Sequence, residues 1–503
     1  MSGVATEMGP AAKPRVLADR PGASRSWALG LSASLVLIVC IRFFSEDLRV
    51  VPALVQYIDV PITGILLFCA FLAFVRRGHL VGASKLGMIL YLFILISLVS
   101  AWINSSRTQL LPVAMFIFNF SAPLIFAVVI IDARLERRDI LLVIRTFFWL
   151  GVLQVVVAVL YGLPRFLASH NPDYVSGTFG QNAYQFTYFI GLWLLYVLGG
   201  SIAGSRSSRR GHTLFITVAA LAVFGLFYAA QYRAMLIFFT LVILLTLWVS
   251  PSRVSSRVLL TVVISAVSVI TLIAVATSFP NLKLLKVFDL FQDSTPIVQS
   301  GKVTAVKNVV AMYGDEPQAA LVGSGPATFS SRAYLTFSAK PRPGKEAVGA
   351  LAVGIMGGQY STDVSTRYIA SIPYKPIQGG TTASSPWSSY TSLAAEVGPL
   401  GFFAYLAAYL AALVFSLRSM RASARVQDTL GVTLAFACFG GLVLLLIQAL
   451  FDNWLETTRV AIPLWTLVGL LYALQRAPLA EQEGDTQESQ PTTAAIAPAG
   501  RRP

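Results

Sequence analysis

The stretch LPVAMFIFNFSAPLIFAVVII, from Leu111 to Ile131, contains no charged side chain. Because a helix of about 20 apolar residues spans the roughly 30 Å of hydrocarbon in a bilayer, this stretch predicts a transmembrane helix. The same criterion, applied along the chain, predicts about twelve spans in total. They lie at 27–44, 51–75, 84–102, 111–131, 140–161, 183–203, 213–230, 234–250, 258–278, 391–416, 429–450 and 459–475.

The composition around this stretch agrees with a membrane-embedded chain. Of the 503 residues, 56% are hydrophobic and only 12% are charged, whereas about a quarter of the residues of a soluble protein are charged. A chain with so few charges cannot cover a water-exposed surface, so lipid must be its solvent. The sequence therefore predicts an all-α membrane protein.

Basic residues alternate in number between successive links, which predicts the orientation. The richer links carry two or three Lys or Arg each, and the opposite short links carry one each. Since cytoplasmic links are enriched in Lys and Arg, we expect the richer links and both termini in the cytoplasm of a bacterium, with the chain in its inner membrane. The net charge of +15 follows this pattern, so nucleic-acid binding is not expected.

One link is much longer than the others and follows the ninth span. It contains Gly and Pro breaks together with amphipathic stretches such as Lys302–Met312, so we expect a large, partly helical periplasmic loop. The predicted regions are a cytoplasmic tail at 1–26, nine spans within 27–278, the periplasmic loop at 279–390, three spans within 391–475, and a disordered cytoplasmic tail at 476–503.

Motifs for cofactors are absent from the sequence. It has neither a G-x-x-x-x-G-K-[ST] loop nor a Rossmann glycine pattern after a strand. Cys40, Cys69 and Cys438 lie in apolar runs without metal-ligand spacing, so no cofactor and no metal are expected. An enzyme outside the cytoplasm has no ATP, and its substrate must arrive activated, as sugars on a lipid diphosphate do. Arginine side chains would suit such an anion.

Two short external links contain candidate functional residues. Arg233 lies between two closely spaced spans, where a charge near the hydrocarbon indicates function or an arginine that snorkels to lipid head groups. Histidine is a common general base at neutral pH, so His170 is either a candidate base or an inert surface histidine. The following segment, Gly177–Asn182, brings glycines and polar groups to the outer face, either as part of a site or as an ordinary turn before a span.

The long loop and the tenth span contain the remaining candidates. Gly323 to Phe329 has the small residues of a backbone anion nest. Arg332 and Arg367 are either ligands or solvated charges. Glu396 follows within an apolar helix, where a carboxylate must find a partner or become neutral. It is a base, a partner for an arginine, or part of a structural salt bridge.

These pieces, in this order, resemble the O-antigen ligase and polysaccharide repeat-unit polymerase superfamily of bacterial membranes. Members carry a Gly-Thr-Phe-Gly string with a following asparagine before a span, an arginine that opens a later span, a Gly-x-Gly with an aromatic in the loop, and Glu-x-Gly-x-x-Gly after it. The matching positions here are Gly177 to Asn182, Arg233, Gly323 with Gly325 and Phe329, and Glu396 with Gly398 and Gly401.

The resemblance implies a metal-independent glycosyl transfer from an undecaprenyl-diphosphate-linked glycan. Arginines would hold the diphosphate while an acceptor sugar hydroxyl attacks the anomeric carbon. The substrate-binding candidates are Arg233, Arg332, Arg367, Asn182, Gly323 and Gly325, and the catalytic candidates are Glu396 and His170. Besides the lipid bilayer, a flippase and a chain-length regulator are the implied partners.

We expect a repeat-unit polymerase that acts at the periplasmic face. A ligase that moves finished glycan to a lipid or protein acceptor is the nearest alternative. A lipid-glycan flippase or transporter is an alternative of another class, because a dozen spans are common among transporters, and a noncatalytic assembly subunit is a further one. The late external loop and the lack of a central cytoplasmic link favour the enzyme.

Overall fold

The structure is a computed structural model, and it describes residues 22–77, 85–133, 135–203, 209–251, 254–278, 301–338, 360–370, 372 and 388–476. Throughout these residues the regular elements are helices, and none is a strand. Most of the predicted tails, and the loop segments 279–300, 339–359 and 373–387, lie outside the described residues.

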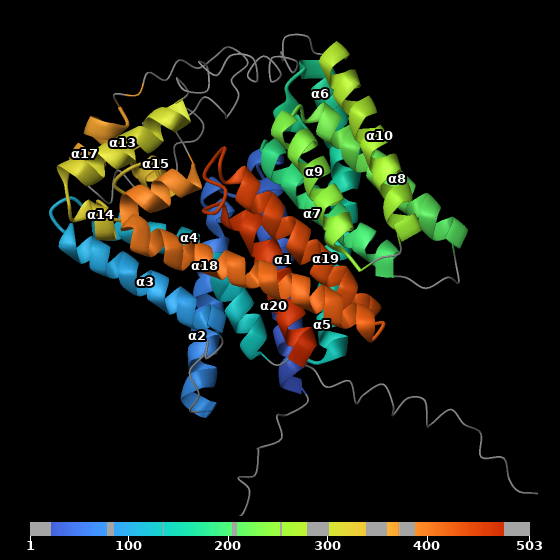
Figure 1. The fold of residues 1–503 in the computed structure, drawn as a ribbon, viewed down its shortest axis with the longest axis horizontal. Coiled ribbons are helices and arrows are strands. Elements are labelled where there is room, and N and C mark those ends of the chain that lie inside the picture. Colours follow the sequence, from blue (N-terminus) through green and yellow to red (C-terminus); the bar gives the residue numbers. More distant parts are fainter. Residues whose placement is uncertain are drawn as a thin grey trace, which may run out of the picture.

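Every predicted span corresponds to a helix in Figure 1. These helices are α1 (Gly22–Arg42), α2 (Asp59–Arg77), α3 (Lys85–Ile103), α4 (Leu110–Asp132), α5 (Arg137–Val157), α7 (Ala183–Ala203), α8 (Arg209–Ala229), α9 (Arg233–Val249), α10 (Val254–Ser278), α18 (Ser389–Arg425), α19 (Thr429–Gln448) and α20 (Thr458–Arg476). Short elements connect them, including the π-helices η1 (Phe43–Asp47) and η3 (Ala158–Gly162), the 3-10 helices η2 (Ala53–Tyr57) and η4 (Pro172–Tyr174), and α6 (Leu163–Ser169).

Within the described residues, eight stretches are long and apolar enough to cross a membrane. They contain α1, α3, α4, α5, α7, α18, α19 and α20. The other four predicted spans form shorter apolar helices at Val55–Cys69, Leu214–Ala229, Met235–Val249 and Thr261–Ala274. The fold class is therefore an all-α protein whose long apolar helices suit a membrane.

Several boundaries differ from those predicted: α2 begins at Asp59 and α18 extends to Arg425. Helix α1 begins at Gly22, inside the predicted tail, because small and polar residues before the apolar run are compatible with a helix. Helix α5 continues through η3 into α6 and ends at Ser169. Pro164 does not interrupt it because this proline lies in the first turn of α6, where its missing N–H is tolerated.

A few helices form the centre of the bundle. The spans of α4, α7, α19 and α20 are largely buried within the described structure, whereas that of α3 is mostly exposed. Aromatic rings fill the core, as where Phe93, Phe120 and Tyr405 pack with ring centroids 4.9 to 6.0 Å apart. The apolar side chains that remain exposed on the outer helices suit contact with lipid tails.

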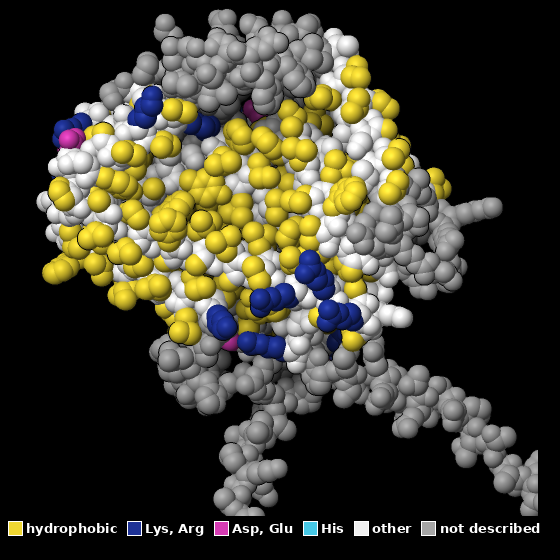
Figure 2. All heavy atoms as spheres, in the orientation of Figure 1, with side chains coloured by type: hydrophobic (Ala, Val, Ile, Leu, Met, Phe, Trp, Pro, Cys, Tyr) yellow, Lys and Arg dark blue, Asp and Glu magenta, His cyan; other side chains and the backbone are white. Residues whose placement is uncertain are grey.

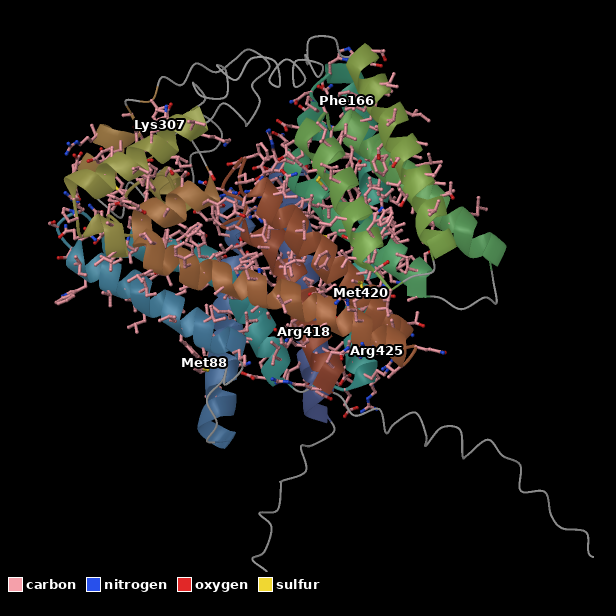
Figure 3. All side chains as sticks on the ribbon, in the orientation of Figure 1. Met88, Phe166, Lys307, Arg418, Met420 and Arg425 are labelled. Carbon is pink, nitrogen blue, oxygen red and sulfur yellow. The ribbon has the colours of Figure 1, made fainter. Side chains whose placement is uncertain are left out.

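The surface divides into a hydrophobic band and charged ends. Figure 2 shows hydrophobic side chains across the middle of the visible face, with Lys and Arg gathered at its lower edge. Arg418 and Arg425, both exposed near the end of α18, lie at that lower end, and Lys307 of α13 (Gly301–Asp315) lies at the opposite end (Figure 3). Such a band flanked by charges is the surface that a bilayer requires.

Candidate functional site

A lid lies over one end of the bundle, built from residues 301–338 and 360–370. It consists of α13, α14 (Ala319–Val322), α15 (Arg332–Ser338) and α17 (Asp363–Tyr368). A small core of its own, with Met312, Phe329 and Val364 among its members, packs against Ala395 of α18. The lid therefore docks on the first turns of α18, as Figure 1 also shows.

The docking place is a break in α18. Gly398 has φ 67° and ψ −179°, and Pro399 has no N–H to offer to the carbonyl oxygen of Ala395. The loop after α14 supplies the missing donors: the Ser324 N–H bonds to the Ala395 oxygen at 2.9 Å and the Gly325 N–H to the Glu396 oxygen at 3.0 Å. The break that Gly398 and Pro399 create thus becomes the attachment of the lid.

The Glu396 side chain completes this attachment. It is fully buried, and Oε1 accepts the backbone N–H groups of Phe329, Ser330 and Ser331 at 3.0, 2.9 and 2.9 Å. Oε2 accepts the N–H of Ala327 at 2.5 Å. The loop does form a backbone anion nest, but its occupant is this carboxylate of the same chain, and neither the predicted arginine nor a salt bridge holds Glu396. We call this arrangement the Glu396 latch.

Gly323 and Gly325, predicted to bind substrate, are packed against other parts of the protein. A Cβ on Gly323 would lie 2.4 Å from the Glu396 carbonyl carbon, and one on Gly325 would lie 2.6 Å from the Thr108 side chain. Their φ angles of 76° and 105° favour glycine. These contacts assign both glycines to the close approach of lid and bundle.

Gly323→Ala is therefore expected to loosen the lid. The added methyl group strains a left-handed backbone, which costs about 1–3 kcal/mol, and it collides with the main chain of α18. Limited proteolysis of the lid should become faster. Gly314→Ala is the matched control, because its Cβ meets no atom within 4 Å. Equal cleavage rates for the two variants would contradict this reading of the junction.

Ion pairs tie the outer parts of the lid. Arg107, in the link between α3 and α4, lies 2.5 Å from Glu316 and 3.2 Å from Asp363. The hydrogen bond that it donates to Glu316 raises the pKa of the Arg107 guanidinium. Arg367, predicted to bind substrate, is exposed on α17 and pairs with Asp315 at 2.8 Å. The Arg367 side chain therefore lies on the lid surface.

Beneath the lid, three arginines lie near one another, and we call them the arginine cluster: Arg42, Arg332 and Arg459. Arg42 ends α1 and pairs with Glu46 at 3.3 Å. Arg459, in the first turn of α20, is only 7% exposed. Arg42 and Arg332 lie near enough to Arg459 to repel its positive charge, and Asp59 and Glu46 lie near enough to attract it. Three separate elements therefore bring cations together around the buried Arg459.

Two members of the cluster, Arg332 and Arg459, donate to uncharged acceptors. Arg332 Nη1 donates to Thr457 Oγ1 at 2.5 Å, and Arg459 Nη2 donates to the Gln56 carbonyl oxygen. The Arg459 Nε has no hydrogen-bond partner. Among the described residues, no carboxylate reaches either guanidinium within ion-pair distance. Buried charges of this kind are costly unless a ligand completes them.

The link between α19 and α20, residues 449–457, surrounds the cluster. Its Glu456 accepts the backbone N–H of Arg332 at 2.6 Å, and its Asn453 donates to the Ser330 carbonyl oxygen at 2.8 Å. Burial opposes the charge of Arg332, but nearby Tyr184, Asp452 and Glu456 outweigh it and raise the pKa of the guanidinium. The environment therefore keeps Arg332 charged.

Lys302 of the lid approaches the same link. Its Nζ donates to the Phe451 carbonyl oxygen at 2.7 Å. Burial lowers the pKa of this amine to about 8, against an opposing attraction from Asp452. A lysine that is charged at neutral pH thus adds positive potential beside the arginine cluster.

Arg233 opens α9 next to this link. The preceding Tyr232 stacks on Trp454 with ring centroids 6.2 Å apart, and its hydroxyl donates to Gln448 at 2.7 Å. The backbone of Arg233 is therefore near the residues that carry Glu456 and Arg459. The Arg233 side chain lies outside the described residues.

The Gly177–Asn182 turn packs against Arg42. A Cβ on Gly180 would lie 2.7 Å from Glu46 Oε2, and the Asn182 amide closes the turn on the carbonyl oxygens of Phe179 and Gly180. Asn182 thus shapes the approach to the cluster. His170 is exposed at the end of α6 with φ 56°, and no hydrogen bond or ion pair in the described structure joins its ring to the cluster.

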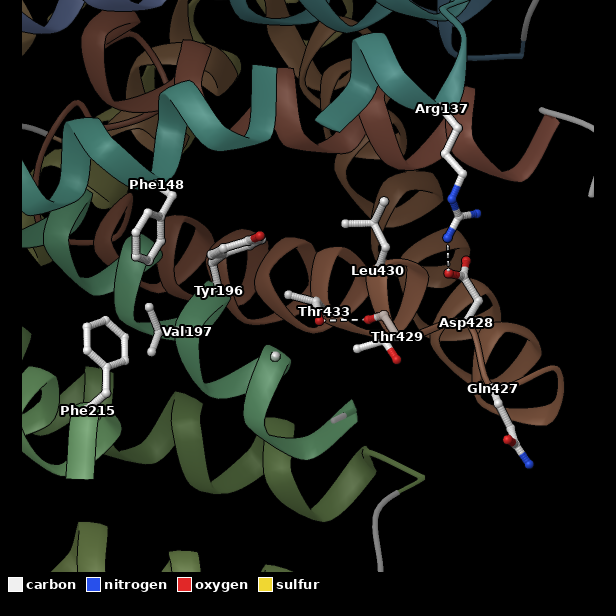
Figure 4. A pocket seen from close by; sticks show the side chains of 11 residues that line it. Arg137, Phe148, Tyr196, Val197, Phe215, Gln427, Asp428, Thr429, Leu430 and Thr433 are labelled. Carbon is white, nitrogen blue, oxygen red and sulfur yellow. Dashed lines mark hydrogen bonds and ion pairs between the residues drawn. The ribbon is translucent and has the colours of Figure 1, made fainter. Parts of the chain in front are cut away.

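A separate cavity of about 520 Å³ lies at the opposite end of the bundle, between α5, α7, α8 and the start of α19. Figure 4 shows Phe148 and Phe215 at one side and Arg137 at the other. Arg137 already pairs with Asp428 at 2.8 Å. This cavity is therefore a weaker candidate for binding an anion than the arginine cluster is.

The chain matches no protein-family model and no curated protein. Function must therefore be argued from the site itself.

Proposed function

We propose that this protein is a membrane glycosyltransferase that lengthens a polysaccharide from a lipid-diphosphate-linked donor, as a repeat-unit polymerase does. The observation that supports it is the pair of guanidinium groups at the lid end of the bundle, the half-buried Arg332 and the buried Arg459, which form no ion pair within the described residues. A diphosphate carries two adjacent anionic groups, and a guanidinium binds phosphate oxygens through paired N–H donors.

The surroundings of the cluster suit a lipid-borne glycan. The rings of Tyr184 and Tyr232 pack on the buried Trp454 of the nearby link, and the half-buried faces of the two tyrosines are aromatic surfaces of the kind that sugar rings pack on. The apolar helices that carry the arginines are in reach of a lipid tail in the bilayer. In our proposal Arg332 and Arg459 hold the leaving diphosphate, with Arg42 and Arg233 beside them, and no metal takes part.

The orientation that we propose has twelve spans, both termini in the cytoplasm and the lid in the periplasm of a bacterial inner membrane. The exposed arginines near the end of α18 support it, because cytoplasmic edges are rich in basic residues. In this orientation the arginine cluster faces the leaflet where exported glycans are assembled. A flippase and a chain-length regulator are then natural partners.

The test is binding and turnover by the purified protein in nanodiscs. Arg332→Ala is expected to weaken binding of an undecaprenyl-diphosphate glycan about 100-fold, since a buried charged contact contributes about 2–5 kcal/mol. Arg138→Ala is the control, because this arginine is exposed at the other end and pairs with Glu136. Equal binding by the two variants would refute the site.

The products distinguish polymerase from ligase. A polymerase gives a ladder of lipid-linked repeat units, whereas a ligase leaves repeat length unchanged and moves glycan to another acceptor. A flippase would bind the donor and change no covalent bond. Labelling of cysteines placed at residues 314 and 418 from outside the cell tests the orientation: only the first should react.

A further inference from the structure

Glu456, an acid of the α19–α20 link, lies directly against the arginine cluster. Its side chain is 1% exposed. Oε2 accepts the Arg332 N–H at 2.6 Å, and Oε1 is buried without a hydrogen-bond partner. A buried polar atom that has no partner is uncommon, because it has lost its water and gained nothing in return. The unpartnered oxygen is therefore an acceptor whose hydrogen-bonding capacity is unused within the described structure.

Neighbouring groups fix Glu456 next to both arginines. The hydroxyl of the adjacent Thr457 accepts a hydrogen bond from the Arg332 guanidinium. Arg459 follows Glu456 by three residues, at the start of α20. The Arg332 N–H holds one carboxylate oxygen and so fixes the rotation of the other. Glu456 thus lies beside the groups that we assign to the diphosphate, close to the bond that the transfer breaks.

The charges facing Glu456 come from several elements. They are Arg332 on α15, Glu396 and the Tyr405 hydroxyl on α18, and Asp452 on the same link. Burial in the first place, then the charge of Glu396, raises the pKa of Glu456 well above its ordinary range, while the Arg332 N–H and charge oppose the shift. A carboxylate with a raised pKa is a stronger proton acceptor.

We propose that Glu456 is the general base of the glycosyl transfer, and that its Oε1 accepts the proton of the acceptor sugar hydroxyl; this rests on the function proposed above. The hydroxyl oxygen forms a bond to the anomeric carbon as its O–H bond breaks. The bond from the anomeric carbon to the phosphate oxygen breaks, and its electron pair leaves on the diphosphate. The proton ends on Glu456, and Arg332 and Arg459 hold the departing anion.

The decisive variant is Glu456→Gln, which keeps the shape and leaves an oxygen for the Arg332 N–H. Donor binding should stay within about threefold, and turnover should fall about 10²- to 10⁴-fold, the usual contribution of a general base. Glu456→Asp should recover part of the turnover. Asp315→Asn, an exposed lid carboxylate, should behave as the wild type does.

The pH profile separates a base from a structural residue. A base acts only when ionised, so wild-type turnover should rise with pH and level off above the raised pKa of Glu456. The residual turnover of Glu456→Gln should lack this rising limb. Wild-type turnover and profile in Glu456→Gln would overturn the inference and leave the proposed function intact.

Two further outcomes are decisive. Failure of the wild-type protein to bind the lipid diphosphate would remove the proposed function itself. If Glu456→Gln does not fold, the wild-type profile and Glu456→Asp decide: a flat profile, or full activity with an unshifted limb in Glu456→Asp, would overturn the role of Glu456.

Discussion

Glu396→Ala is expected to release the lid from α18, because the substitution orphans four backbone N–H groups in one step. The groups of Ala327, Phe329, Ser330 and Ser331 all donate to this carboxylate. An unmade buried hydrogen bond costs about 1–3 kcal/mol, so the latch contributes at least about 4 kcal/mol to lid docking. Hydrogen exchange of residues 323–331 should rise strongly, with little change in the central helices.

Glu396→Gln gives a graded control for the latch. The amide oxygen can occupy the position that accepts three N–H groups, while the NH₂ group would face the Ala327 N–H, donor against donor. We therefore expect exchange between those of the wild type and Glu396→Ala. Asp315→Asn, on the exposed side of the lid, should leave exchange unchanged. Wild-type protection in Glu396→Ala would show that the nest does not hold the lid.

The helices could be predicted from the sequence because membrane spans are local signals. Runs such as Leu111–Ile131 contain their own length and apolarity, and each predicted span corresponds to a helix. The start of the first span and the end of the fifth were predicted less accurately. Small and polar residues such as those near Gly22 are compatible with a helix, and so is a proline in the first turn of α6, but hydropathy measures neither.

The latch was only half predictable. The glycines from Gly323 to Gly325 indicated an anion nest, and Glu396 was identified as a buried carboxylate that needs a partner. Their pairing depends on a contact between segments about 70 residues apart, and a single sequence carries no signal for such contacts. The pattern Glu396-Val397-Gly398-Pro399 held the clue, since Pro399 must leave a carbonyl of α18 without its helical donor.

The arginine cluster was predictable only in part, for the same reason. Arg332 was identified from the loop, whereas Arg42, Arg459 and Glu456 were not among the predicted site residues. One sequence signal for the cluster was available. Asp452, Glu456 and Arg459 bring charges of both signs to a single short link and the start of the apolar span after it. Arg367 has the same residue type but pairs with Asp315 on the surface, which shows that residue type alone does not identify the ligand.

Arg459→Met is expected to have opposite effects on stability and on binding. Without donor, the wild-type guanidinium is buried, its Nε has no hydrogen bond, and Arg42 and Arg332 repel it. Replacing such a buried charge by an apolar side chain of similar volume is often neutral or stabilising by about 1–4 kcal/mol. The unliganded variant should therefore melt at the same temperature as the wild type or higher.

With the lipid diphosphate present, the order should reverse. The wild type gains stability in proportion to the logarithm of donor concentration over Kd, whereas Arg459→Met, which lacks a cation for the phosphate, should gain almost none. Arg459→Lys keeps the charge without the planar pair of donors and should fall between them. Melting curves of the three proteins in nanodiscs, with and without donor, measure both effects. A variant that is less stable without donor and equally stabilised by it would mean that Arg459 holds the fold together and does not bind the substrate, because only a ligand-binding charge is stabilised by the arrival of its anion.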